Sequence, residues 1–357
     1  MTRIALIKVG ALGDVVRTTV VPPGLRHLYG DLELIWITGR DALPLVQNAP
    51  AVSAAVLIED SADPYWRSLH YEWVICLDDD DPSCALASKL RTRRLSGGYK
   101  IGNQLAYTSD LEPWFGMGLL RPQDLGGLAR ANELKRANKR THGEILYQCL
   151  GLPLPVPRPS VNVSSEARQK AASWLREKRL DHPLVALNTG AGSRWRYKSW
   201  SESQTAELAR AISEQFTASV LIVGGAAEAA RNRRIEALAS RPTVVAASTN
   251  LDLIAFGALL EQCDLVVSSD SLAVHLSNAL KKRTIVFFGP TSAAEIDLYN
   301  FGEKIITPLE CRGCYFRECD IRPHCMDSIT VTPMLQATAR ALSRIRAEAG
   351  GSAADDL

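Results

Sequence analysis

Short apolar runs recur along most of the chain, and polar or helix-like stretches separate them. The runs are rich in β-branched residues and lack the strict alternation of a half-exposed strand, which indicates strands that are covered on both faces. Such strands are typical of parallel sheets. The predicted strands are residues 3–9, 32–38, 53–59, 73–78, 184–189, 219–225, 243–248, 264–269 and 284–289.

Helical patterns lie between the later strands, at residues 201–216, 228–239 and 271–282. Strand–helix alternation of this kind predicts an α/β fold with doubly wound parallel sheets. The stretch "GLPLPVPRPS" (151–160) interrupts the pattern with four prolines in ten residues. Because proline cannot continue a helix or a central strand, this stretch predicts a linker between two domains.

The domain boundaries follow from this linker. An N-terminal α/β domain covers residues 1–152, the linker covers 153–160, a C-terminal α/β domain covers 161–348, and a disordered tail covers 349–357. In open α/β sheets, ligands bind outside the carboxyl ends of the strands. Two such domains therefore predict a ligand in a central cleft that both domains face.

The composition fits a packed protein with nearly balanced charge. Of the 357 residues, 46% are hydrophobic and 22% are charged, and the net charge is +2. That balance gives no support for a nucleic-acid partner. The basic run "KLRTRR" (89–94) is interpreted as a solvated face, with an acidic membrane surface or another polyanion as the alternative partner.

No segment of the sequence predicts membrane insertion. No apolar run reaches the ~18 residues of a spanning helix. The stretch "MTRIALIKVG" (1–10) lacks the small-residue cleavage site of a signal peptide and predicts a first strand instead. We therefore expect a cytoplasmic protein, and peripheral contact with the cytoplasmic face of the inner membrane stays open.

The first strand ends in a glycine turn, "KVGALGDVVRTT" (8–19). It is not a phosphate-binding P-loop, because Gly10 and Gly13 are too close together and Asp14 follows them, and it holds only part of the dinucleotide fingerprint. An acidic side chain also suits a phosphate poorly. Asp14 is therefore either the N-cap of the following helix or a functional carboxylate.

Two stretches at strand ends in the second half contain candidate ligand-binding residues. The stretch "NTGAGSRWRYKSW" (188–200) combines small residues with Lys198, and predicts either a phosphate site or a flexible loop with one exposed lysine. In "VGGAAEAARNRR" (223–234), Glu228 can accept hydrogen bonds from a ribose diol, or it can complement a helix dipole.

A third stretch, "SSDSLAVHLSNAL" (268–280), places Asp270 and Ser271 at a strand-to-helix junction. The N-terminus of this helix offers unpaired N–H groups to an anion, and His275, one turn after Ser271, can reach the same anion. A lone histidine on a helix is usually structural. The prediction therefore depends on its combination with the serine-rich helix start and the turn "FFGPT" (287–291).

The eight cysteines fall into two groups. Those predicted to be buried as small hydrophobic residues are Cys76, Cys84, Cys149 and Cys263. Those that lie within fifteen residues, with the spacing C-x2-C-x4-C-x5-C, are Cys311, Cys314, Cys319 and Cys325. In a cytoplasmic chain this clustering favours a structural zinc or iron site, and reduced thiols or disulfides are the alternatives.

Together these stretches resemble glycosyltransferase family 9, the heptosyltransferases that build the lipopolysaccharide core. The family's opening, a strand and a Leu-Gly-Asp-Val turn, is matched by Lys8 and "LGDVV" (12–16). Its small-residue turn with Lys-x-Trp is matched by residues 188–200. Its Asp-Ser/Thr-x-x-x-His-Leu motif and the following Phe-Gly-Pro-Thr are matched by "DSLAVHL" (270–276) and by residues 287–291.

The resemblance implies the GT-B architecture, in which the first of two Rossmann-like domains binds mainly the acceptor and the second mainly the nucleotide-sugar donor. It implies an inverting transfer of heptose from ADP-heptose to a lipopolysaccharide-core or related glycan, with no metal needed for the chemistry. Asp14 would be the general base, and Gly10 and Gly13 would let the turn approach a sugar. The implied donor-binding residues are Thr189, Lys198, Glu228, Asp270, Ser271 and His275.

The same resemblance extends to the cysteines, because some members of the family use a similar cluster as an iron-binding finger. Other features depart from the better-known members: Arg17 and Thr18 follow the glycine turn, and the turn before Lys198 is longer and more basic. Three alternatives therefore stay open. They are a transferase with a protein acceptor or another nucleotide sugar, a nucleotide-sugar 2-epimerase, and a non-enzymatic nucleotide- or metal-binding regulator.

Overall fold

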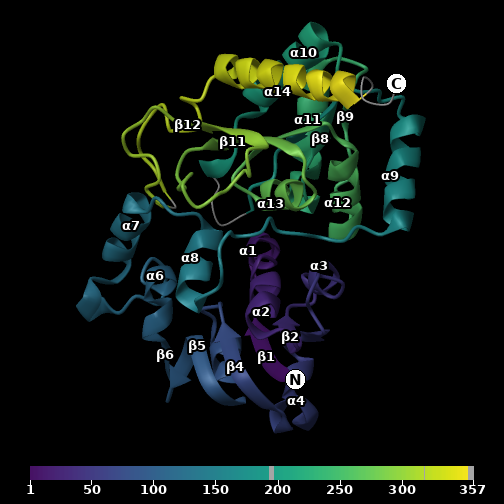
Figure 1. Cartoon of the computed structure of the whole chain (residues 1–357). Helices are drawn as coiled ribbons and strands as arrows, with labels where there is room; N and C mark the ends of the chain where they lie inside the picture. The colour runs from purple at the N-terminus through teal and green to yellow at the C-terminus, as the bar shows by residue number, and fades with distance from the viewer. Residues whose placement is uncertain (193–196, 317, 353–357) are drawn as a thin grey trace. The chain divides into compact units, whose positions relative to one another are not determined.

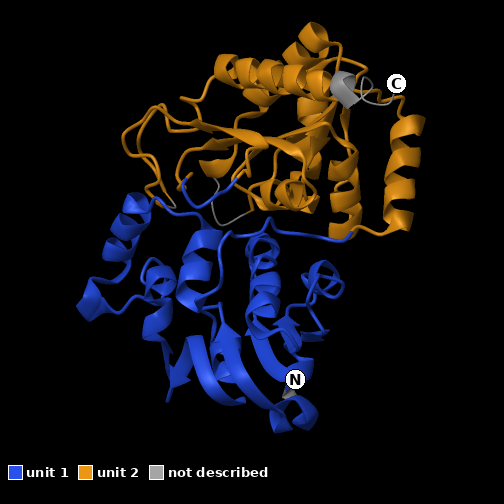
Figure 2. Ribbon diagram, viewed as in Figure 1, with its two compact units in different colours: residues 1–162, 294–297 blue, residues 163–293, 298–357 orange. Residues whose placement is uncertain are grey.

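The chain divides into two compact units, each built around its own sheet (Figure 2). The computed structural model describes residues 1–192, 197–316 and 318–352. Unit 1 comprises residues 1–162 and 294–297, and unit 2 comprises residues 163–293 and 298–357. The division after residue 162 falls just beyond the proline-rich stretch that the sequence assigns to a linker, whereas nothing in the sequence indicates that residues 294–297 belong to unit 1.

Unit 1 contains a six-stranded sheet with the order β3-β2-β1-β4-β5-β6. All neighbouring strands are parallel except β5 and β6, which form an antiparallel pair. Strand β1 lies in the middle, paired with β2 and β4 and buried over its apolar residues, so its carboxyl end opens at the centre of the sheet. The strands are β1 (Thr2–Ile7), β2 (Leu32–Thr38), β3 (Ala54–Leu57), β4 (His70–Cys76), β5 (Arg91–Ile101) and β6 (Gln104–Tyr107).

Helices follow most strands of unit 1, as Figure 1 shows. They are α1 (Leu12–Thr18), α2 (Val21–Tyr29), α3 (Leu43–Val46), α4 (Pro64–Ser68), α5 (Asp81–Ala87), α6 (Glu112–Phe115), α7 (Gly127–Ala137) and α8 (His142–Leu150). Helix α8 begins with a capping box: the Thr141 hydroxyl accepts from the Glu144 N–H, and the Glu144 carboxylate accepts from the Thr141 N–H. Gly151, in the left-handed conformation, ends it.

Unit 2 contains a parallel six-stranded sheet with the order β12-β11-β10-β7-β8-β9. Its order places β7 and β10 side by side at the centre, where the chain crosses from one half of the sheet to the other. This is the position at which doubly wound sheets bind ligands. The strands are β7 (Leu184–Asn188), β8 (Ser219–Val223), β9 (Val244–Ala246), β10 (Leu265–Ser269), β11 (Arg283–Phe288) and β12 (Gly302–Ile306).

The helices of unit 2 are α9 (Ser165–Glu177), α10 (Glu202–Phe216), α11 (Ala229–Ala239), α12 (Leu253–Gln262), α13 (Leu272–Ala279) and α14 (Val331–Ser352). Helix α14 corrects one prediction, because it includes residues 349–352 that the sequence assigns to a disordered tail. The rest of that tail, residues 353–357, lies outside the described residues. Among the described helices, none is both long enough and apolar enough to cross a membrane.

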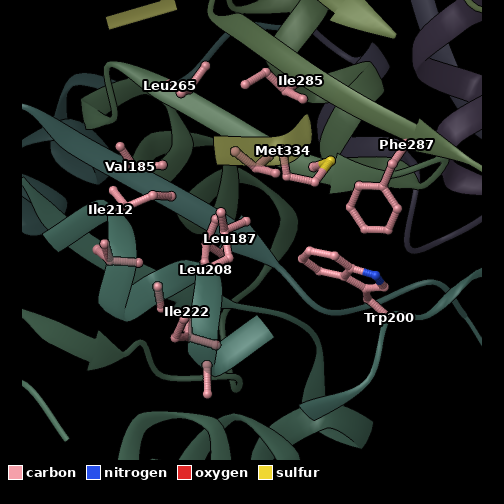
Figure 3. Close-up of a cluster of buried hydrophobic side chains, with 14 of the residues drawn as sticks. Val185, Leu187, Trp200, Leu208, Ile212, Ile222, Leu265, Ile285, Phe287 and Met334 are labelled. Carbon is pink, nitrogen blue, oxygen red and sulfur yellow. The ribbon is translucent and has the colours of Figure 1, made fainter. Parts of the chain in front are cut away.

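One apolar cluster packs the sheet of unit 2 against α10 and α14 (Figure 3). Trp200 lies at its edge, with its ring centroid 5.6 Å from that of Phe287. The Trp200 indole N–H is shared between the carbonyls of Met326, at 3.1 Å, and Ile329, at 2.8 Å. These contacts fix the position of Trp200, which is two residues after Lys198.

The α/β class with two parallel-sheet domains is confirmed, and β2 coincides with the predicted strand. The basic run 89–94 was not predicted as a strand, although it opens β5. There Arg94 lies 3.8 Å above the Trp73 ring and pairs with Asp110, and Arg93 pairs with Glu72. Charged side chains give no apolar pattern, so the sequence does not indicate this strand; Trp73 and Glu72 on β4, and Asp110 after β6, are their partners.

Candidate active site

Asp14 lies in the first turn of α1, directly after the central strand β1 of unit 1. The N-cap of α1 is Ala11, so the N-cap role considered for Asp14 is wrong. Its carboxylate pairs instead with the Arg17 guanidinium, one turn further along the helix. The Asp14 side chain keeps 32% of its surface exposed, so it remains reachable from solvent.

Positive charge around Asp14 keeps it ionised. Burial alone would raise the pKa of this carboxyl, but the charges of Arg17, then Lys8, then His142 outweigh that effect and hold its pKa well below the ordinary value. His142 is buried at the start of α8, with its ring edge-on to Trp114 at 4.9 Å. Asp14 is therefore a carboxylate throughout the physiological range, able to accept a proton but only as a weak base.

Lys8 and Asp78 form hydrogen bonds with the backbone of the turn that precedes Asp14. The Lys8 ammonium donates to the Asp78 carboxylate and to the Gly10 carbonyl, and the Val9 N–H donates to the other Asp78 oxygen. Both side chains are almost completely buried. Burial lowers the pKa of Lys8, but the carboxylates of Asp78 and Asp14 outweigh it and hold that pKa above the ordinary value, so the ammonium persists.

The structure does not support a role for the conformational freedom of Gly10 and Gly13 in this turn. Neither Gly10 nor Gly13 has a positive φ, so the turn does not depend on glycine's conformational freedom. Apart from the two neighbouring residues, no atom of the described residues lies within 4 Å of the position that a Cβ on Gly10 would take, so there is open space beside the turn. Gly13 lies within α1. Space near Asp14, rather than backbone strain, is what Gly10 provides.

Lys198, Asp270 and His275 come together in unit 2, beyond the carboxyl end of β10. The Lys198 ammonium lies 2.8 Å from the Asp270 carboxylate and 3.2 Å from the Asp270 carbonyl oxygen. The His275 Nε2 lies 4.0 Å from the other carboxylate oxygen of Asp270. Three of the predicted donor residues therefore form one small group of mixed charge.

A network of small polar side chains connects this group to β7. The Asn188 amide donates to the Gly190 carbonyl at 2.7 Å, to the Ser268 hydroxyl at 3.0 Å and to the Ser271 hydroxyl at 3.1 Å. Ser268 and Ser271 also share a hydrogen bond of 2.9 Å. Ser271 is the N-cap of α13, but its side chain makes no capping bond. The network fixes the positions of Gly190 and Ser271, which each lie two residues after the end of a strand, β7 and β10 respectively.

Thr189 and Glu228 follow β7 and β8, at the carboxyl ends of the strands of the same sheet. The Thr189 hydroxyl points inward, to Asn232 Oδ1 at 2.5 Å and the Val223 carbonyl at 3.2 Å. One Glu228 carboxylate oxygen accepts from the Gly225 N–H at 2.9 Å. A Cβ on Gly190 would lie 3.2 Å from that same oxygen, so glycine there permits the close approach of Glu228 to the end of β7.

Arg231 is a residue that the sequence analysis missed. Its guanidinium donates to the Thr189 carbonyl at 3.4 Å and to the Trp200 carbonyl, which stand on either side of the segment that contains Lys198. Residues 193–196 of that segment, which the sequence marks as unusually basic, lie outside the described residues. Burial lowers the pKa of Arg231. Its position before Arg233 and Arg234 in a polar helix gave no signal that it turns inward.

None of the eight cysteines, all of which lie in the described residues, forms a disulfide, and Cys76, Cys84, Cys149 and Cys263 are buried as predicted. Burial, and then the proximity of the thiols of Cys314, Cys311 and Cys319, raises the pKa of Cys325 to about 11. Four cysteine thiols are a donor set that suits zinc or iron. Within the ranges 1–192, 197–316 and 318–352, however, no three His, Cys, Asp or Glu side chains are arranged as ligands.

The structure thus gathers the predicted residues into two groups, each within one unit. In unit 1 Asp14 is joined by Lys8, Asp78, Arg17 and His142. The resemblance to the family names Lys8 in a motif, and it places Asp78 and His142 only in the family-like connectors 75–81 and 138–152, with no role assigned. In unit 2 the predicted donor residues are joined by Asn188, Asn232 and Arg231. A buried lysine at the end of an apolar strand was the one signal that could have pointed to Asp78, because such a charge needs a partner.

Comparison with known proteins adds a family match. The model of glycosyltransferase family 9 (heptosyltransferase) matches residues 135–324, which is more than half of the chain. Lipooligosaccharide heptosyltransferase 2 of Campylobacter jejuni subsp. jejuni serotype O:2 is 29% identical over 161 residues. That match covers 41% of this chain and 47% of the relative, so about half of the relative's length is spanned.

Solved structures show similarity of fold over nearly the whole chain. A glycosyltransferase of family 9 from Veillonella parvula is 14% identical with a TM-score of 0.77, and covers 96% of this chain and 98% of its own. The Escherichia coli ADP-heptose heptosyltransferase II is 16% identical with a TM-score of 0.66, at 96% and 99% coverage. The E. coli heptosyltransferase WaaC with ADP is 16% identical with a TM-score of 0.60, also at 96% and 99%.

Proposed function

The chain belongs to glycosyltransferase family 9, the heptosyltransferase family, and from this premise we propose that it moves a heptose from ADP-heptose to a lipopolysaccharide-core or related glycan acceptor. The transfer inverts the configuration of the anomeric carbon. The reaction takes place on the cytoplasmic side of the inner membrane, where a nucleotide sugar is available. The family match supports the class of reaction, and the site residues support the mechanism.

The observation that carries the proposal is the position of the partly exposed Asp14 carboxylate, in the first turn of α1 directly after the central strand β1 and paired with Arg17. An acceptor hydroxyl attacks the anomeric carbon, its O–H proton passes to Asp14, and the bond from that carbon to the donor's β-phosphate oxygen breaks. ADP leaves with the electron pair of the broken bond. Because proton transfer accompanies bond formation, a weak base held in place suffices.

The leaving diphosphate needs positive charge that is already in position. Lys198 supplies it, held by Asp270, while the His275 ring beside the same carboxylate is a further hydrogen-bonding group and the N-terminus of α13 adds its backbone N–H groups. Ser271 lies at that N-terminus, and Thr189 fixes the end of β7 through Asn232. Glu228, with one carboxylate oxygen engaged by Gly225, offers the other to the ribose diol.

Ligands bound in similar structures support ADP-heptose as the donor. WaaC of E. coli has been solved with ADP and with ADP-2-deoxy-2-fluoro heptose. The dodecameric iron-containing heptosyltransferase TibC, 12% identical with a TM-score of 0.55, has been solved with ADP-D-beta-D-heptose. These ligands belong to those proteins, and they make ADP-heptose the first donor to test here.

The test is a donor panel. Purified protein is incubated with ADP-, GDP-, UDP- and dTDP-sugars, with and without a lipid-A-core acceptor, and release of nucleoside diphosphate is measured. Release of ADP from ADP-heptose alone, dependent on the acceptor, supports the proposal. Release of nucleoside diphosphate from another nucleotide sugar identifies a different donor. Release that requires a polypeptide acceptor supports the alternative of a transferase that modifies proteins. No binding of any donor contradicts the proposal and favours the regulator.

We also propose that Cys311, Cys314, Cys319 and Cys325 bind one structural zinc or iron ion. Their thiols are close enough to raise the pKa of Cys325 together. The similar glycosyltransferase TibC of enterotoxigenic E. coli is iron-containing, which makes iron the first candidate. The ion takes no part in the transfer chemistry, because the cluster is separate in sequence from the donor-binding residues and its ligands would be saturated by four thiolates.

A further inference from the structure

Arg231 of α11 lies in the candidate site of unit 2 and has no part in the mechanism proposed above. Its side chain is half-buried. It lines a small cavity together with Thr189, which follows β7, and Trp200. We call residues 197–200, which contain Lys198 and end at Trp200, the lysine segment. Arg231 therefore lies between this segment and the carboxyl end of β7.

The Arg231 guanidinium bridges two positions of the backbone. It donates to the Thr189 carbonyl at 3.4 Å, just after β7, and to the Trp200 carbonyl, just before α10. Arginine suits such a bridge, because its N–H donors stand in a rigid planar fork. The two hydrogen bonds attach the last residue of the lysine segment to the carboxyl end of a central strand.

The partners of Arg231 are backbone carbonyls rather than carboxylates. Within the part of the chain that the structure describes, no carboxylate forms an ion pair with its guanidinium. The nearby Glu202 pairs with Arg234 instead, at 2.6 Å, and Glu228 accepts from the Gly225 N–H. This choice of partners indicates that Arg231 fixes the course of the chain.

The lysine segment has two further points of attachment, both through side chains. The Lys198 ammonium lies 2.8 Å from the Asp270 carboxylate. The Trp200 indole N–H donates to two backbone carbonyls of the same unit. Arg231 differs from both, because it binds a backbone carbonyl of the segment. It thereby fixes the backbone two residues from Lys198, which neither side-chain contact does.

We propose that Arg231 is a positioning residue for the donor: by holding the Trp200 carbonyl at the end of β7, it keeps Lys198 where the diphosphate of the donor binds. The inference rests on the proposed function, since it takes Lys198 as the group that meets the diphosphate. A positive charge that is already in position stabilises the diphosphate without the cost of ordering the chain. Arg231 itself stays on the two carbonyls and touches neither the diphosphate nor the reacting atoms.

The test is calorimetric binding of ADP and of adenosine to the full chain and to Arg231→Met. Methionine keeps much of the bulk of the side chain but cannot donate to either carbonyl. We expect the variant to bind ADP about tenfold more weakly, and to bind adenosine, which lacks the diphosphate, as the native chain does. Unchanged affinity for ADP overturns the inference. Equal losses for ADP and adenosine also overturn it, because they would show general damage to the site.

Two further variants separate positioning from charge and from folding. Arg234→Met is the matched control, since Arg234 is an exposed arginine of the same helix that pairs with Glu202, and it should leave both affinities unchanged. Arg231→Lys keeps the charge but not the planar fork, so it should bind ADP as weakly as Arg231→Met. Full affinity for ADP in Arg231→Lys would show that charge alone suffices, which contradicts the bridge. An unchanged melting temperature shows that each variant is folded.

A double-mutant cycle tests whether Arg231 acts through Lys198. Lys198→Met alone should weaken ADP binding, and Arg231→Met added to it should weaken binding further by about twofold at most, because both changes remove the same contact. Losses that multiply in the double variant contradict the inference. A native chain that binds no ADP contradicts the proposed function instead, whereas native binding of ADP that Arg231→Met leaves intact contradicts this inference alone.

Discussion

Arg17 sets how strong a base Asp14 is, because its guanidinium contacts the carboxylate directly. The sequence marked Arg17 only as a departure from better-known family members, and it could not show the contact. A charge next to a carboxylate stabilises its ionised form, so it lowers both the pKa and the basicity. At the scale of single residues, then, the property to measure is the acid limb of activity, which is the pH range in which kcat/KM falls as pH is lowered.

For Arg17→Met we expect the acid limb of kcat/KM to move to higher pH. Asp14 has a lowered pKa in the native protein and stays ionised as pH falls. Removing its first positive neighbour raises that pKa, so Asp14 becomes protonated, and inactive as a base, at a higher pH. The measurement is kcat/KM against pH for the native chain and the variant. An unmoved limb would show that Asp14 does not control it.

A second residue-scale prediction concerns the buried pair below the turn. Lys8→Met leaves the buried Asp78 carboxylate without its partner, and should lower the free energy of unfolding by about 3–5 kcal/mol. Arg3→Met, which breaks the more exposed pair with Glu33, should cost about 1 kcal/mol or less. Chemical denaturation measures both. Replacing Lys8 and Asp78 together by Met and Leu should recover much of the loss, and equal costs for Lys8 and Arg3 would contradict the importance given to the buried pair.

At the scale of elements, the apolar strands could be predicted and the polar ones could not. Strand β2 has apolar residues on both faces, and its limits agree with the prediction. Strand β5 begins with charged residues and contains Gly97 and Gly98, so neither periodicity nor propensity indicates it. Tertiary contacts decide there: β5 exists because β4 and β6 pair with its two edges.

Gly97→Ala tests how tightly β5 depends on its glycines. Gly97 has φ +100°, and a Cβ there would lie 1.8 Å from the Cys76 carbonyl oxygen, on the neighbouring strand. We expect a loss of about 3 kcal/mol or more in the free energy of unfolding. The control is Gly102→Ala, at φ +59°, which should cost only about 1 kcal/mol because, apart from the adjacent residues, no described atom lies within 4 Å of the Cβ position. Denaturation curves in which the two variants are equally stable would show that β5 can shift to relieve the contact.

The candidate site shows the same division between what sequence predicts and what it does not. Asp14, Lys198, Asp270 and His275 could be named because their motifs follow strand ends, which is where parallel sheets bind ligands. Their partners could not, because Asp78 and Asn232 are brought to the site by other strands and helices. Thr189 was predicted as a donor contact; its hydroxyl donates to Asn232 Oδ1 and to the Val223 carbonyl, and its role in donor binding stays a prediction.

At the scale of the whole molecule, the chain divides into two units close to the proline-rich stretch. Residues 294–297 also belong to unit 1, which the sequence does not indicate. The family assignment also belongs to this scale, since the matching region, residues 135–324, continues from unit 1 into unit 2. Within each unit the chemistry-bearing residues stand at the carboxyl ends of the central strands. The fold thus explains why the candidate motifs of each unit, although separated in sequence, lie at one end of its sheet.

The cysteine cluster gives a prediction for the stability of the whole chain. Cys311→Ser with Cys314→Ser should abolish stoichiometric zinc or iron and lower the melting temperature, because a structural ion stabilises the folded state that binds it. Elemental analysis and thermal unfolding measure both quantities. Cys149→Ser, in a buried cysteine outside the cluster, should keep the metal. A native chain purified anaerobically without zinc or iron would contradict the metal proposal.

The decisive experiment on the proposed mechanism compares Asp14→Asn with the native chain, measuring turnover of ADP-heptose and binding of ADP side by side. Asparagine keeps the shape of the side chain but cannot take the acceptor proton. We expect a fall in kcat of about 10³-fold, with the affinity for ADP unchanged because Lys198, Asp270 and His275 lie in the other unit. Full turnover in the variant would contradict the role of Asp14, and with it the proposed mechanism.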